Sequence, residues 1–507
     1  MLLVKRGRTL ARSVTRRRRP GSGDTRPSRR DADRWRPERV IPAMGLVLLV
    51  AIGIGTVSSD RTDDSGVGSG GEADVSVAPA TALPAFPGAQ GFGANTPGGR
   101  GGRVIEVTSL DDSGPGTLRR AMEASGPRIV VFRTGGTIRL HGEIDVRNPF
   151  LTIAGQSAPG DGITLRATPG NSEGLVDLHT HDVVIRFVRF RQGAHTKIDA
   201  AIPLALERSW NVVIDHCSFS WATDENLTVW DDTSNVTISW NIISEGLSHS
   251  THYDGEHSRG LFLSGDRSRD ISAHHNLMTH NMRRNPEVNT EGTADIRNNV
   301  AYDWGTHAAQ FSDKRGRHGV NVVGNYFKPG PSTSEPDRYE LDVYPYGHGG
   351  AALYVTGNIG PHRPRSDLPD RDSVDPEGRR WLVSNPHPAP PVTTTSAAQA
   401  YDDVLAKAGV RVPTLDAVDE RIIREVKNGT GRIIDDPDDV GGWPDLRAGT
   451  PPPDTDHDGM PNAWEQARGL NPRRDDSAGK REGLPYTNVE EYLDGLVPAQ
   501  LERAGSS

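Results

Sequence analysis

A twelve-residue segment near the C-terminus has the residue types and the spacing of a metal-binding loop. Asp454, Asp456 and Asp458 alternate with other residues, Gly459 follows them directly, and Glu465 ends the segment. This spacing places alternating oxygen atoms around one Ca²⁺ ion, with glycine at the tight turn and a bidentate glutamate at the end. No second full loop follows in the sequence. We therefore predict one structural calcium loop, and a solvated acidic loop is the alternative.

Polar residues also gather in three stretches of the central region, where they could form a second site. The carboxylates are Asp199, Asp224 and Glu225, and the cations are Arg283 and Arg284. Carboxylates that lie together repel unless a cation joins them, and Ca²⁺ prefers such oxygen ligands. Arginines beside that ion would bind an anionic substrate. Spacing alone leaves open that these are separate charges on surface loops.

A recurring frame indicates which elements position these stretches. Each copy has β-branched residues alternating with polar ones, then asparagine, then two apolar residues, and successive copies lie 23 to 35 residues apart. The asparagines of the frame are Asn241, Asn276, Asn299, Asn325 and, in a weaker copy, Asn358. One coil cannot bury its apolar face alone, but stacked coils form a continuous core, which predicts a parallel β-helix. Asparagine at one position is typical of a turn in the left-handed conformation, and stacked copies can hydrogen-bond as a ladder.

The alternative fold is a β-sandwich of many short strands. A sandwich explains the β-branched segments but gives no reason for asparagine at one repeat position. In a β-helix neighbouring coils lie about 4.8 Å apart, so residues one coil apart in sequence can share a face. The predicted β-helix would therefore bring the polar stretches together.

Composition excludes several classes of protein. The hydrophobic set makes up 34% of 507 residues, and 57 glycines add small core residues, which excludes a wholly disordered chain. Cys217 is the only cysteine, so an intrachain disulfide and a cysteine-built metal site are excluded.

The N-terminal region has a charge opposite to that of the rest. Residues 1–40 hold fourteen Lys and Arg against four Asp and Glu, which gives this region a charge of +10. Because the whole chain has a net charge of −9, residues 41–507 carry a charge of −19. A basic tail can bind nucleic acid. Here it precedes the uncharged segment 40–59, which is typical of an export signal or a membrane anchor. We expect a secreted protein that does not bind nucleic acid, and tethering at the outer face of a membrane through 40–59 is the alternative.

Changes in composition along the chain predict five successive regions, and we expect the protein to be a monomer. These are a basic leader with export signal or anchor (1–59), a linker (60–85), the β-helix (86–360), a loop and helical appendage (361–450), and a calcium-loop module with tail (451–507). Within the appendage, segments 399–408 and 416–427 have helical spacing, with Asp416 as an N-cap.

Several segments resemble the bacterial pectate lyases of polysaccharide lyase family one. They are FPGAQGFGA (86–94), PGGRGGRV (97–104), SGPGTLR (113–119), TIAGQ (152–156), VIDH (213–216) and HHN (274–276). The resemblance covers residues 86–360. It implies a right-handed parallel β-helix and a Ca²⁺-dependent β-elimination of α-1,4-galacturonan, the polymer of pectate, to 4,5-unsaturated oligogalacturonides.

The resemblance also assigns roles to arginines. The catalytic base of the family, an arginine shortly after HHN and just before a proline, falls on Arg284, and a substrate-binding cation falls on Arg259. Arg283, next to the base, is a further candidate for substrate binding. A further family arginine falls on Asn289, which is a departure. The uronate C5 proton becomes acidic when cations neutralise its carboxylate, and a base then removes it. Arginine is an unusual base, so this chemistry implies an alkaline optimum.

The resemblance places an active-site calcium ion as well. The family's calcium carboxylates fall on Asp199 and Asp224, and a third falls on Thr228, which is a departure. Glu225 is the candidate substitute for that missing carboxylate.

Other functions remain open from the residues alone. A polygalacturonase would share the fold but needs paired carboxylates, and the motif Gly347–His348–Gly349 lacks the aspartate motifs that should precede it. A non-catalytic solenoid could bind the same anionic polysaccharide without cleaving it. A lyase acting on a different uronan is a further alternative.

Overall fold

The computed structural model describes residues 83–193 and 200–501. Contacts divide the chain into two units, Met1–Val77 and Ala78–Ser507, and every helix and strand of the described ranges belongs to the second unit. The expected leader and anchor (1–59), almost all of the expected linker, and Asp199 lie outside the described residues. Within the described ranges, no helix is both long and apolar enough to cross a membrane.

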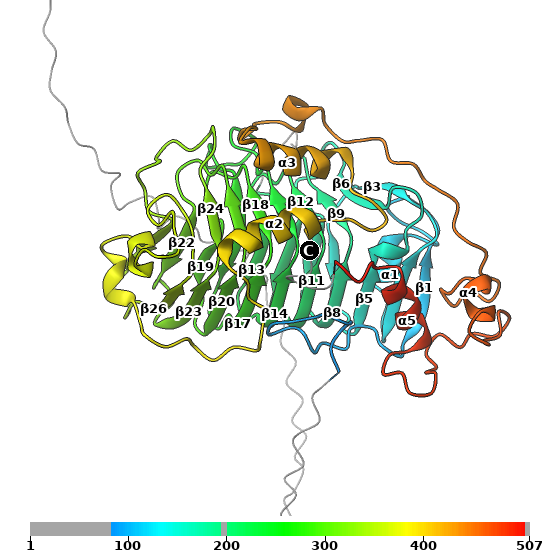
Figure 1. Ribbon diagram of the computed structural model, residues 1–507. Helices are drawn as coiled ribbons and strands as arrows, with labels where there is room; N and C mark the ends of the chain where they lie inside the picture. Colours follow the sequence, from blue (N-terminus) through cyan, green and yellow to red (C-terminus); the bar gives the residue numbers. More distant parts are fainter. Residues whose placement is uncertain (1–82, 194–199, 502–507) are drawn as a thin grey trace, which may run out of the picture. The chain divides into compact units, whose positions relative to one another are not determined.

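The predicted right-handed parallel β-helix is confirmed by three sheets whose neighbouring strands all run parallel. Successive strands visit the three sheets in turn, and Figure 1 shows them stacked side by side. The first sheet contains β1 (Arg103–Val107), β2 (Arg128–Phe132), β5 (Leu151–Ala154), β8 (His181–Arg186), β11 (Trp210–Asp215), β14 (Ser234–Ser239), β17 (Arg269–His274), β20 (Thr293–Arg297), β23 (His318–Val323) and β26 (Ala351–Thr356).

The other two sheets have eight strands each. The second sheet contains β4 (Ile144–Val146), β7 (Val176–Leu178), β10 (Leu204–Glu207), β13 (Glu225–Trp230), β16 (Arg259–Ser264), β19 (Glu287–Asn289), β22 (Ala309–Ser312) and β25 (Leu341–Tyr344). The third sheet contains β3 (Gly136–Leu140), β6 (Ile163–Ala167), β9 (Arg189–Arg191), β12 (Ser218–Ser220), β15 (Ile242–Ser244), β18 (Leu277–Thr279), β21 (Val300–Tyr302) and β24 (Tyr326–Lys328). One core of Val, Ile, Leu and Phe side chains from all three sheets runs through the coils.

The asparagine frame forms a buried ladder between the first and third sheets. The side-chain amide of Asn241 donates to Asn276 at 3.0 Å, and Asn276 donates to Asn299 at 2.9 Å. The ladder continues to Asn325 and Asn358. The left-handed backbone conformation expected at the asparagines occurs instead at the residue before each of them, where φ is positive, as at Trp240 and His275. The prediction was therefore wrong by one residue. The frame thus requires asparagine for its amide and not for its backbone.

Helices lie outside the solenoid. They are α1 (Leu118–Met122), α2 (Ala397–Lys407), α3 (Ala417–Asn428), α4 (Asn462–Gln466) and α5 (Asn488–Gly495), with short 3₁₀ turns η1 (Gly155–Ser157), η2 (Asp370–Ser373), η3 (Gly378–Trp381) and η4 (Pro437–Val440). The helices α2 and α3 occur where the sequence predicts them, and the Asp416 side chain accepts from the Asp419 N–H as an N-cap. Both pack on the third sheet (Figure 1), whereas α4 and α5 pack near β1, β2 and β5.

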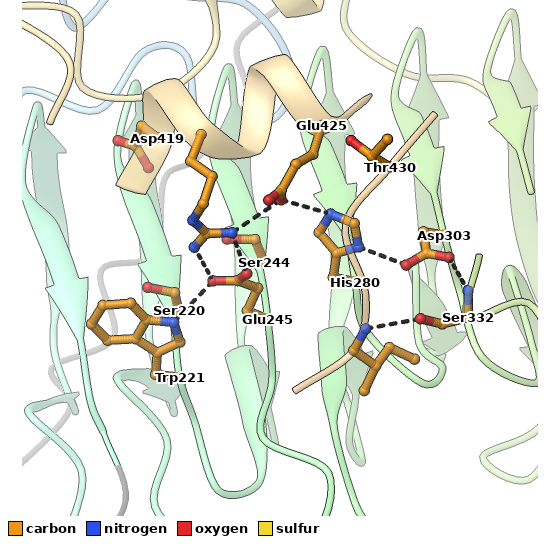
Figure 2. A network of polar contacts seen from close by, with 12 residues as sticks. Ser220, Trp221, Ser244, Glu245, His280, Asp303, Ser332, Asp419, Glu425 and Thr430 are labelled. Atoms are coloured by element: carbon orange, nitrogen blue, oxygen red, sulfur yellow. Dashed lines mark hydrogen bonds and ion pairs between the residues drawn. The ribbon is translucent and has the colours of Figure 1, made fainter. Parts of the chain in front are cut away.

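A network of buried charges joins α3 to the third sheet (Figure 2). The Arg421 guanidinium contacts Glu245 at 2.7 and 2.8 Å and Glu425 at 3.0 Å. The ring of His280 contacts Asp303 at 2.7 Å and Glu425 at 3.4 Å. Burial alone would lower the pKa of His280, but these two carboxylates raise it to about 9. The protein therefore supplies its own cations to these carboxylates.

Candidate active site

Three successive coils bring sequence-distant charged residues together on the outer face of the second sheet. Glu225 begins β13 and pairs in register with Arg259, which begins β16. Arg259 in turn pairs with Arg283 of the following coil. These residues therefore lie side by side because the coils stack in parallel register.

Arg284 is fixed firmly on this face. Its guanidinium forms an ion pair with Glu225 and another with Glu287 at 2.9 Å, and it lies 4.0 Å from the ring centre of Phe262. Its backbone N–H donates to the side-chain oxygen of Gln310 at 3.1 Å. The backbone has φ +66°, a conformation that costs free energy for a residue with a side chain. The surroundings thus hold Arg284 in one orientation.

Asp224 lies beside two imidazoles. Nε2 of His257 is 2.7 Å from one of its oxygens, Nε2 of His252 is 3.8 Å from the other, and the Arg259 guanidinium is 3.9 Å away. Burial opposes ionisation of Asp224, but the imidazoles and Arg259 hold its pKa well below the usual range. Burial lowers the pKa of His257 to about 4.

Sequence reasoning missed these two histidines, and it placed Glu287 in the third polar stretch without predicting its contact with Arg284. A signal was present, because the interval between Asn241 and Asn276 is the longest in the frame at 35 residues. The inserted loop between β15 and β16 carries both His252 and His257.

Thr228 and Asn289, the two positions that differ from the family pattern, form hydrogen bonds with neighbouring residues. Thr228 lies on β13, with its hydroxyl 3.5 Å from Glu225. The Asn289 amide donates to Ser264 and accepts from the backbone N–H of Arg315. Asn289 therefore helps to position the neighbouring coil and brings Arg315 to this face.

The described carboxylates of this face have partners within the protein. Glu225 is engaged by Arg284 and lies 3.6 Å from Arg259, and Asp224 faces imidazole nitrogens. Calcium takes six to eight oxygen ligands. The expected ion between Asp199, Asp224 and Glu225 would depend on Asp199, which lies outside the described residues.

In the C-terminal loop, by contrast, carboxylates lie close together, and several have no hydrogen-bond partner among the described residues. The side-chain oxygens of Asp454, Asp456 and Asp458 come within 4.8 Å of one another, as do those of Asp458, Glu465 and Asp476. Among the described residues, neither oxygen of Asp456, Glu465 or Asp476 has a hydrogen-bond partner. Burial and the neighbouring carboxylates raise the pKa values of Asp458 and Glu465 to about 7. This arrangement of oxygens fits Ca²⁺.

Asp476 is a member of this cluster that the motif did not reveal. It lies beyond the twelve-residue spacing, and its backbone N–H donates to Asp458 at 3.3 Å. Asn488, at the start of α5, donates to the Asp476 carbonyl at 2.8 Å. The fold thus returns the chain to the loop after the motif has ended.

The loop is attached to the first coils of the β-helix. Met460, Val489 and Leu493 pack with Ile129 and Val131 of β2. The His457 ring contacts Glu106 of β1 at 2.8 Å. An ion in the loop would therefore hold α4 and α5 against the end of the solenoid.

The chain is similar to fungal proteins over most of its length. It is 37% identical over 435 residues to a probable pectate lyase C of Aspergillus fumigatus, which covers 83% of this chain and 95% of the relative. A probable pectate lyase 18 of Arabidopsis thaliana is 31% identical over 180 residues, covering 32% and 41%. These relatives do not support the expected bacterial subgroup.

Solved structures are more distant. The cedar pollen major allergen is 19% identical with a TM-score of 0.45, covering 64% of this chain and 92% of the allergen. A pectate lyase from Bacillus sp. N165 in complex with trigalacturonate is 20% identical with a TM-score of 0.42, covering 64% and 99%. No protein-family model matches. The identity to the Aspergillus relatives, maintained over nearly their whole length, shows that the chain belongs to the pectate lyase family.

Proposed function

We propose that this chain cleaves pectate, an α-1,4-linked galacturonan, by β-elimination. The observation that carries the proposal is the group formed by Arg259, Arg283 and Arg284 on the outer face of the second sheet. Each sugar of the polymer has a carboxylate that such arginines can bind. The names of the Aspergillus relatives support this choice of substrate.

In the proposed mechanism, Arg259 and Arg283 bind the uronate carboxylate and stabilise the charge that develops next to C5. The Arg284 guanidinium first gives a proton to hydroxide at alkaline pH; its neutral form then removes the C5 proton, and the electrons of the C5–H bond form the C4–C5 double bond. The O4 leaving group departs with the electrons of its bond to C4 and takes a proton from water. Glu225 and Glu287 orient the Arg284 guanidinium for this step.

The test is an absorbance assay of the purified full chain with polygalacturonate at alkaline pH. A rise in near-UV absorbance is expected, because elimination creates an unsaturated product. New reducing ends without that rise would mean hydrolysis and would overturn the proposal. Binding of the polymer without either product would leave a non-catalytic solenoid.

The hydrolase alternative has no matching site around Gly347–His348–Gly349. The Asp313 carboxylate accepts from the backbone N–H groups of Tyr346, His348 and Gly350. It therefore stabilises a turn and is not free to act with a second carboxylate as acid and base.

The C-terminal loop is proposed as a structural calcium site. Its ligands are Asp454, Asp456, Asp458, Glu465 and Asp476, whose oxygens converge and in part have no other described partner. When bound, the ion supplies the positive charge that these carboxylates require.

The location and organisation of the chain are proposed from its sequence. Export is supported by the basic leader and the uncharged segment 40–59. The proposed order is leader (1–59), linker (60–85), β-helix (86–360), appendage (361–450) and calcium module (451–507), in a monomer. N-terminal sequencing of protein from the culture medium tests export, and retention of segment 40–59 would favour a membrane tether. Size-exclusion chromatography with light scattering tests the monomer.

A further inference from the structure

Two aromatic side chains connect Arg284 with another arginine on the outer face of the second sheet. The Arg284 guanidinium lies 4.0 Å from the ring centre of Phe262, and the ring centre of Phe262 lies 5.5 Å from that of Trp230. The Arg315 guanidinium lies 5.3 Å from the Trp230 ring centre. The four side chains form a continuous row that begins at the proposed base and ends at Arg315. The proposed elimination mechanism uses only Arg284 of this row.

The alternation of side chains along β13 and β16 places the two rings outside the solenoid. Phe262 follows Leu261 and Trp230 follows Val229, and both aliphatic side chains lie in the core. Successive side chains of a strand point to opposite faces of the sheet. Both rings are only partly buried, so a ligand that lies on this face can contact them.

Arg315 is held in place and keeps hydrogen-bonding capacity. Its backbone N–H donates to the Asn289 side chain at 3.1 Å, and its guanidinium contacts Asp266 at 2.6 Å. The Asp266 side chain is 61% exposed, and ion pairs at such exposure contribute little stability. Nε of Arg315 has no hydrogen-bond partner within the described ranges, and a guanidinium can donate five hydrogen bonds. Arg315 can therefore bind a carboxylate while it keeps its contact with Asp266.

The chemistry of the row matches a second sugar of an acidic polysaccharide. A pyranose ring has an apolar face of C–H groups that packs on aromatic rings, and a uronate also carries a carboxylate that an arginine binds. We propose that Trp230, Phe262 and Arg315 bind a galacturonate unit next to the unit that reacts at Arg284. The two rings contact the sugar face, and Arg315 binds the carboxylate. This inference rests on the proposed function, since it assigns a second sugar position on the same face.

The experiment is isothermal titration calorimetry of the full chain with hexagalacturonate, at about pH 6 and with calcium present. The proposed base is protonated at this pH, so turnover is slow. Trp230→Ala should weaken binding about tenfold at low and at high salt, because ring contact does not depend on charge. Arg315→Gln should weaken binding about tenfold at low salt and clearly less at high salt, because salt screens an ion contact.

A matched pair at the other end of the solenoid provides the controls. The Arg468 guanidinium lies 4.1 Å from the ring centre of Trp464, a partly buried tryptophan of α4. Trp464→Ala and Arg468→Gln should both bind hexagalacturonate as the wild type does. Trp230→Phe keeps an aromatic ring and should retain most of the affinity. Thermal unfolding of each variant checks that it is folded.

The same variants are assayed on polygalacturonate at alkaline pH. For Trp230→Ala and Arg315→Gln, KM should rise about tenfold while kcat changes by about threefold at most, because neither residue contacts the reacting atoms. Wild-type affinity and KM in both variants would overturn the inference and leave the lyase function standing. An equal loss of affinity in Trp464→Ala would also overturn it. Affinity that depends on Trp230 and Arg315, in a chain that releases no unsaturated product, would support the second sugar position and overturn the proposed elimination.

Discussion

The C-terminal loop and the outer face of the second sheet both collect carboxylates, but they balance the charge differently. In the loop, the side-chain oxygens of Asp456 and Glu465 have no described hydrogen-bond partner, and Asp476 has only a 3.5 Å ion pair with Arg474. On the face, Glu225 is paired with Arg284, and Asp224 lies 2.7 Å from His257 and 3.9 Å from the Arg259 guanidinium. Carboxylates without a protein cation need a metal ion, whereas compensated carboxylates hold cations in place for an anionic substrate.

The network under α3 is a third way in which the protein balances the charge of clustered carboxylates. There Asp303, Glu245 and Glu425 are paired with His280 and Arg421, two cations of the protein itself (Figure 2). Acidic residues alone therefore do not identify a calcium site. The nearest cations decide whether a cluster is a metal site, a substrate site or a structural ion-pair network.

The largest effect is expected from Arg284→Lys, which tests the catalytic half of the comparison. Lysine keeps the charge but loses the fork that contacts both Glu225 and Glu287, so kcat should fall by about 100-fold to 10,000-fold. The measurement is the initial rate of near-UV absorbance on polygalacturonate. Calcium affinity of the C-terminal loop should be unchanged, which distinguishes this loss from unfolding. Full activity would rule out Arg284 as the base.

The second prediction contrasts one glutamate from each region in the presence of a chelator. Glu225→Gln should lower the free energy of unfolding by about 3 kcal/mol, because it removes one partner of a buried ion pair. Glu465→Gln should raise it by about 1 kcal/mol at pH 8, because it relieves repulsion among carboxylates. Urea unfolding measures the change in the free energy of unfolding for each variant. If both changes have the same sign, the proposed difference between the two regions is contradicted.

The third prediction concerns pH and the internally neutralised network. The pKa of His280 is about 9 in the folded protein, above its ordinary value of 6.5. Its charged form therefore stabilises the fold fully below about pH 6.5, and this contribution of about 3 kcal/mol is lost as pH rises through 9. Urea unfolding at a series of pH values should show this loss, and His280→Gln should flatten it. An identical pH profile in the variant would contradict the assignment.

The last prediction concerns calcium removal from the wild-type chain. A ligand at 100 times its Kd stabilises the folded state by about 2.7 kcal/mol, so a chelator should lower the unfolding temperature by a few degrees. Calorimetry with added calcium, and with Asp456→Asn as the matched variant, measures the shift. A chelator response that persists in Asp456→Asn would place the relevant ion elsewhere.

Sequence patterns predicted much of this architecture for a local reason. The asparagine frame repeats once per coil, so it encodes both the coil length and the ladder between Asn241 and Asn358. The D-x-D-x-D-G spacing encodes a single turn of chain, and the structure brings its carboxylates together as expected. The backbone conformation expected at the asparagines was wrong by one residue, because the ladder needs their amides and the preceding residue makes the turn.

By itself the sequence predicted the solenoid and the calcium-loop motif, since each depends on spacing along the chain, whereas the roles of the arginines were implied by a family resemblance. The tertiary structure decided the partners. It placed Glu287 and Glu225 on Arg284, His252 and His257 on Asp224, and Asp476 in the loop. These contacts depend on coil register and on the path of inserted loops. Which charges neutralise one another depends on which residues are neighbours in the folded structure, and this cannot be seen from their order along the chain.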